Sequence, residues 1–123
     1  TREGVDAVLL EIADGVLQRE TSTLLQSQVF AQATGGIVLA AQDSMGAAAG
    51  VNWLAKYPTP TLALAGKLTA APLQVKEAQA AIGLPIFGLD DLATGRIALE
   101  LLGKAQQHLA KTKATASAKT EAY

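Results

Sequence analysis

Residues 5–15 run Val5-Asp6-Ala7-Val8-Leu9-Leu10-Glu11-Ile12-Ala13-Asp14-Gly15, an apolar stretch that ends in two carboxylates and a glycine. A short apolar run of this kind is typical of a strand buried between layers of helices. The sequence predicts a strand over Asp6 to Ala13 and then a helix over about Glu20 to Ala33. Because ligands bind at the carboxyl ends of strands in open α/β sheets, Glu11 and Asp14 are expected at a functional edge.

The rest of the chain repeats this order of strand and then helix. Thr34-Gly35-Gly36 ends the first helix, since glycine readily takes the left-handed conformation of a helix C-terminus. Further strands are predicted over Ile37 to Ala41, Thr61 to Ala65 and Leu84 to Leu89, and further helices over Met45 to Lys56, Pro72 to Ala81 and Ala93 to Lys111.

Strand-then-helix units in succession predict a parallel sheet with right-handed crossovers. The expected fold class is therefore α/β, a three-layer Rossmann-like domain with a mostly parallel four-stranded sheet flanked by helices. This single domain is expected over residues 1–111. Residues 112–123 are rich in Ala, Lys and Thr without apolar periodicity, which predicts a flexible tail.

Composition limits the classes of function. The 123 residues suit one domain, and its core must be aliphatic because 50% of residues are hydrophobic but only 4% are aromatic. The net charge of -1 gives no global field to hold nucleic acid or an acidic membrane. No apolar run approaches the roughly 20 residues that cross a bilayer. With no cysteine and no signal peptide at Thr1-Arg2-Glu3-Gly4, a cytoplasmic protein is expected.

Glu11 and Asp14 are the candidate catalytic residues. A carboxylate at a strand end holds Mg²⁺ through water or orients a water for attack on phosphate, and Asp14 is the candidate metal ligand. Gly15 would let a phosphate approach the backbone. The alternative is that Asp14 only shapes the turn while Glu11 pairs with a neighbouring arginine.

Arg19 is a candidate ligand-binding residue, because it precedes a helix and would point toward the same crevice as the two acids. The alternative is a capping pattern. In that pattern Thr21 or Ser22 caps the helix and Glu20 complements its dipole.

Asp43, Lys67 and Thr69 are further candidate ligand-binding residues, since they follow the second and third predicted strands. Asp43 has a simple alternative as a helix N-cap. The run Gly66-Lys67-Leu68-Thr69 is not a phosphate loop, because that loop needs G-x-x-x-x-G-K-[ST] to wrap its backbone around the phosphates. His108, the single histidine, is expected on a solvated helix face, and no Ser-His-Asp set is present.

The order of these parts resembles the second half of a P-loop NTPase, in the class that includes dethiobiotin synthetase-like enzymes and the GTPases. Val8 to Gly15 is similar to an acidic Walker B strand, and Ala65 to Thr69 falls where the class has a base-recognition loop. The resemblance covers about residues 5–111. It departs from the class in two ways, because neither a Walker A loop nor an Asn-Lys-x-Asp pattern is present.

Two hypotheses follow for the function. By the resemblance, the chain is the C-terminal half of a nucleotide-binding domain that is not hydrolytic on its own. Glu11 and Asp14 would then manage Mg²⁺ and water, Arg19 would meet phosphate, and an upstream domain or partner would carry the phosphate cradle. The alternative is a non-catalytic α/β module that binds a small ligand or a partner and self-associates through Gly46 to Ala55. An unpaired sheet edge also favours a homo-oligomer. Whether the chain is an enzyme is left open by its sequence.

Overall fold

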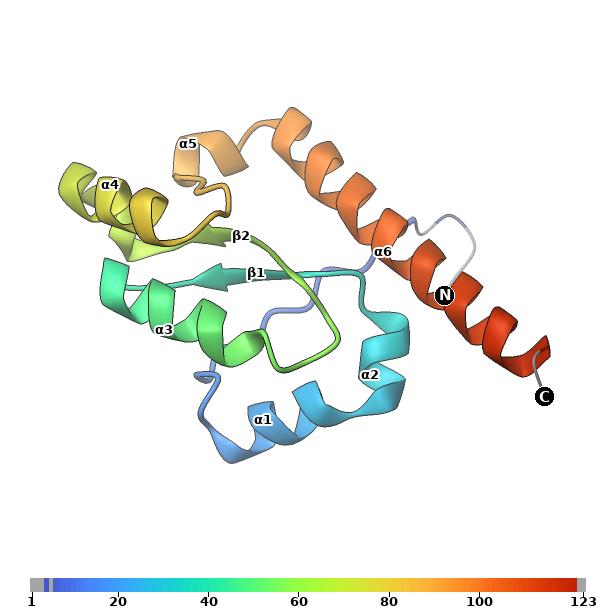
Figure 1. Ribbon diagram of the computed structural model, residues 1–123. Coiled ribbons are helices and arrows are strands. Elements are labelled where there is room, and N and C mark those ends of the chain that lie inside the picture. The colour runs from blue at the N-terminus through green and yellow to red at the C-terminus, as the bar shows by residue number, and fades with distance from the viewer. Residues whose placement is uncertain (1–3, 5, 122–123) are drawn as a thin grey trace.

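The computed structural model describes Gly4 and residues 6–121, with side-chain surroundings through Ser117. Figure 1 shows helices around a small central sheet, with the C-terminal part of the last helix extending away from the rest. In chain order the elements are α1 (Arg19–Gln26), α2 (Gln28–Ala33), β1 (Ile37–Ala40), α3 (Ser44–Leu54), β2 (Thr61–Ala65), the 3-10 helix η1 (Lys67–Ala70), α4 (Pro72–Ala81), α5 (Leu89–Leu92) and α6 (Gly95–Glu121).

The sheet consists of β1 and β2, paired in parallel. Leu39 lies opposite Leu64 and Ala40 opposite Ala65, with an irregularity between Ile37 and Val38. On its other side β2 forms a single bridge, in which Leu64 donates to the Pro85 carbonyl at 2.9 Å. The crossover from β1 to β2 through α3 is the connection that a parallel pair requires.

The four-stranded sheet expected from the sequence is wrong, because the described residues form only this two-stranded sheet. The predicted strand at residues 6–13 is an unpaired coil, and Val5 lies outside the described residues. The predicted strand at Leu84 to Leu89 makes only the bridge at Ile86. Pro85 has no N–H to donate to a ladder, and the chain turns at Gly88 into α5.

Several other elements match the expectation closely. β2 and α4 have the predicted bounds, and Pro72 is in the first turn of α4.

Two helical regions differ from the expectation. The predicted helix over Glu20 to Ala33 is broken at Ser27, whose backbone is extended and whose hydroxyl accepts from Phe30 N at 3.3 Å. The expected tail is helical through Glu121, since its alanines favour helix and no glycine or proline interrupts it.

Two apolar clusters hold these elements together. The first contains Ala47, Leu64, Leu68, Ala78 and Ile82, and it joins α3 and α4 to β2. The second contains Leu25, Leu54 and Tyr57, and it joins α1 to the end of α3. The side chains are mainly aliphatic, as the composition predicts.

Gly66 is required where β2 ends. Its φ is +100°, and a Cβ there would lie 2.7 Å from both the N and the O of Ala41. Any other residue would therefore have a strained backbone conformation at this position. Its Cβ would also clash with the backbone of Ala41, which cannot move aside as a flexible side chain can.

We expect Gly66→Ala to lower the free energy of unfolding by about 1–3 kcal/mol, the usual cost of a strained backbone conformation. Gly83→Ala is the matched control, because a Cβ there meets nothing within 4 Å. Urea denaturation of both variants measures the difference. Equal stability of the two variants would contradict the close approach of Gly66 to Ala41.

Candidate functional site

The carboxyl ends of β1 and β2 are joined by backbone hydrogen bonds. Ala41 N donates to the Ala65 carbonyl at 3.0 Å, and Leu68 N donates to the Ala41 carbonyl at 3.1 Å. Asp43, Lys67 and Thr69 follow directly on these residues, so the structure brings all three predicted positions to one edge of the sheet.

The polar side chains at this edge serve the local backbone. Asp43 Oδ1 accepts from Gly46 N at 2.6 Å, which confirms the N-cap alternative. The Thr69 hydroxyl donates to the Gly66 carbonyl at 2.8 Å. Lys67 is exposed and makes no ion pair with any described residue. Of the three, only Lys67 presents a charge that is not already used within the fold.

Ser44 makes contacts that the sequence did not reveal. Its N–H donates to Gln74 Oε1 at 2.8 Å, and its hydroxyl donates to Glu77 Oε2 at 2.6 Å. These bonds tie the start of α3 to α4. The partners are about thirty positions apart in sequence, so no local pattern could have indicated them.

The predicted residues before α1 are not held in a built site. Glu11, Asp14 and Gly15 are exposed in the unpaired coil. No set of three His, Cys, Asp or Glu residues that could hold a metal ion occurs in the described part of the chain. The role of Asp14 as a Mg²⁺ ligand therefore stays a prediction.

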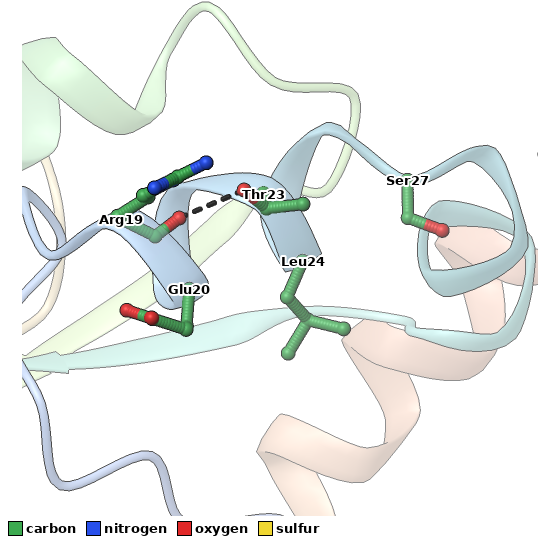
Figure 2. A pocket seen from close by; sticks show the side chains of 5 residues that line it. All are labelled: Arg19, Glu20, Thr23, Leu24 and Ser27. Atoms are coloured by element: carbon green, nitrogen blue, oxygen red, sulfur yellow. Dashed lines mark hydrogen bonds between the residues drawn. The ribbon is translucent and has the colours of Figure 1, made fainter.

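Arg19 is the first residue of α1, on a face that Figure 2 shows from close by. The cap is Gln18, whose Oε1 accepts from Glu20 N at 2.9 Å, in place of the predicted Thr21 or Ser22. In Figure 2 the guanidinium of Arg19 and the carboxylate of Glu20 point away from each other. The hollow that they line with Thr23, Leu24 and Ser27 is an open part of the surface, and its charges do not converge.

A second hollow, of about 660 Å³, lies at the opposite end of the strands. It is lined by the ends of α3 and α4 and by the loop through Thr59. Thr59 is 2% exposed, and its hydroxyl has no hydrogen-bond partner among the described residues. The buried hydroxyl is closed off from solvent, so it offers no group to a ligand in this conformation.

The apolar segment, defined here as residues 6–13, carries several exposed apolar side chains close together in sequence. Leu9 is 97% exposed and Val8 76%, and Leu10 and Ile12 are also exposed. No backbone hydrogen bond joins this segment to the rest of the described structure. A group of neighbouring exposed apolar side chains often marks a site where another molecule binds.

The β1 edge, defined here as the outward backbone groups of Val38 and Ala40, is unpaired. Ile37 N donates to the Pro60 carbonyl and Ala41 N to the Ala65 carbonyl, so the backbone groups of these residues point toward β2. Because the N–H and C=O groups of successive strand residues point to opposite sides, those of Val38 and Ala40 point away from β2. In the described part of the chain β1 pairs only with β2. Val38 is also 42% exposed, which leaves one face of this strand partly uncovered.

The chain was compared with protein-family models, curated proteins and solved structures, and none of these comparisons gave a match. The resemblance to P-loop NTPases therefore rests on the positions of strands and loops predicted from the sequence, and it stays a prediction. Among the described residues, no helix combines the length and the apolar character needed to span a bilayer.

The hydroxyl of Tyr57 contacts α1 through Ser22. Its hydroxyl lies 3.3 Å from Ser22 Oγ, and Lys56 Nζ lies 5.1 Å from its ring centre. The hydrogen bond with Ser22 is the main cause that lowers the pKa of Tyr57 below 10.0, while desolvation acts in the opposite direction. The folded state thus favours tyrosinate. This contribution to stability is present above pH 10.0 and is lost as the pH falls through the lowered pKa.

We expect Ser22→Ala to raise the pKa of Tyr57, because the variant removes the bond that favours the charged form. Ultraviolet titration in a Tyr123→Phe background isolates the signal of Tyr57. Thr23→Ala is the control, since its hydroxyl bonds to the Arg19 carbonyl and leaves Tyr57 untouched. An identical titration for all three proteins would show that α1 does not dock through this hydrogen bond.

Proposed function

We propose that this chain is a non-catalytic α/β module that binds another polypeptide through the β1 edge and the apolar segment. The observation that carries this proposal is the combination of an unpaired strand edge with exposed Val8, Leu9 and Leu10 on the same chain. Unpaired N–H and C=O groups at a strand edge are a ready template for an added strand. Apolar side chains then supply the free energy of association, at about 1.5–3 kcal/mol for each one fully buried.

The polar groups support a binding role over a catalytic one. Asp43 and Thr69 are engaged with local backbone, whereas Glu11 and Asp14 lie on an exposed coil and make no hydrogen bond or ion pair with any described residue. General acid–base catalysis needs a group positioned within hydrogen-bond reach of its substrate. A cytoplasmic setting belongs to this proposal, since the chain has no cysteine for disulfides.

We expect a synthetic peptide with the sequence of residues 6–13 to bind the β1 edge of the full chain. Nuclear magnetic resonance at low protein concentration would show shifted amide signals and slowed hydrogen exchange at Val38 and Ala40. The control is the same peptide with lysine at the positions of Leu9 and Leu10. If the exchange of both amides is unchanged at every peptide concentration, the edge is not a docking site.

Nucleotide binding by a half-domain is the second candidate function. It is supported by the loops after β1 and β2, which meet at one edge with Asp43, Lys67 and Thr69. In this proposal Glu11 and Asp14 would hold Mg²⁺ and water, and Arg19 would meet phosphate. The phosphate cradle would come from an upstream domain or another chain.

Calorimetry with Mg-ATP and Mg-GTP separates the two candidates. The partner-binding proposal predicts no tight binding to the isolated chain, because no described group of acids is arranged to hold the metal. Tight binding that is lost in both Asp14→Asn and Lys67→Ala would favour the nucleotide site instead. Both residues are exposed, so neither substitution should disturb the fold.

A further inference from the structure

We infer that the polypeptide docked at the β1 edge is the apolar segment of a second copy of this chain. Two copies would exchange their segments reciprocally and form a dimer with two-fold symmetry. This inference rests on the proposed function, because it names the partner that the edge receives.

Each chain carries both halves of the contact. The apolar segment has eight residues, which span about 26 Å as a strand, and the four residues of β1 span about 13 Å. The segment is therefore long enough to pair along the whole of β1. When two copies exchange their segments reciprocally, the same two surfaces are used twice, and the contact closes as a dimer with two-fold symmetry.

The charges of the chain favour exchange over direct pairing of two segments. Asp6 and Glu11 make each segment acidic, and like charges placed opposite each other destabilise a strand pair. The residues of β1, Ile37 to Ala40, carry no charge. A segment that pairs with the β1 edge of the other copy therefore meets apolar and backbone groups and avoids the second acidic segment.

The contact has the size of a stable interface. Burial of one exposed aliphatic side chain removes on the order of 100 Å² from water, by the usual coefficient for apolar area. In the added strand Val8, Leu10 and Ile12 lie on one face and Leu9 on the other. With both faces covered, these side chains in both copies give about 800 Å², and the surfaces they cover bring the total to roughly 1,600 Å², the typical area of a specific interface.

Engineered cysteines test which chain supplies the segment, because the natural sequence has none. The full chain with Val38→Cys is mixed with each of Val8→Cys, Leu9→Cys and Leu10→Cys in turn and then oxidised. We expect one of the three mixtures to give a covalent dimer that contains both variants, since a disulfide requires directly neighbouring residues. With both cysteines on one chain, the disulfide is expected to join two chains. A disulfide formed only within single chains would overturn the inference.

Light scattering of the unmodified chain measures the assembly directly, and it should show a dimer. Leu9→Lys should weaken dimerisation at least about tenfold, the factor that 1.4 kcal/mol represents. Leu73→Lys is the matched control, because Leu73 is 66% exposed on α4, away from both surfaces. Circular dichroism should show both variants folded, since neither side chain is buried.

The outcomes separate this inference from the function on which it rests. A chain that stays monomeric but binds the peptide of residues 6–13 overturns the dimer and leaves the partner-binding function. A dimer that survives Leu9→Lys is held by another surface, such as α3, and also overturns the exchange. A chain that neither dimerises nor binds the peptide contradicts both.

Discussion

The parallel pairing of β1 with β2 is the contact on which the rest of the structure depends. It places the Ala65 carbonyl against Ala41 and so fixes where both strands end. Gly66 then turns the chain with a backbone that only glycine adopts easily, directly against Ala41. Leu64, which is fully buried, connects this pair to α3 and α4. Loss of this register would release both the core and the loops at the strand ends.

The two outer edges of this small sheet differ in their contacts. On the side of β2, the bridge from Leu64 to Ile86 covers the middle of the strand and α6 contacts it as well. At the other edge of the sheet, no described residue pairs with the outward side of β1. Natural proteins usually shorten, charge or cover an exposed edge, and β1 is short but neither charged nor paired on its outward side with any described residue. This asymmetry is why the binding proposal centres on β1.

The sequence was sufficient where local chemistry decides the structure. Pro72 sets the start of α4, the apolar run at Thr61 to Ala65 gives β2, and Asp43 caps α3. It was insufficient where a distant partner decides. A strand needs a neighbour to satisfy its hydrogen bonds, and the composition of residues 6–13 does not say whether one is present. The sequence also did not indicate the contacts of Ser44 with α4, because these partners are distant along the chain.

The same reasoning limits what could be predicted of the site. Asp43, Lys67 and Thr69 share an edge because each follows a strand that does form. Glu11 and Asp14 follow no strand, because residues 6–13 stay a coil that makes no backbone hydrogen bond to the sheet. If the apolar segment runs parallel to the β1 of a second copy, these acids come to the carboxyl end of that strand, beside Asp43 and Lys67. If it runs antiparallel, they lie at the opposite end. The direction of a single strand therefore decides whether the dimer has a composite acidic site or only an apolar interface.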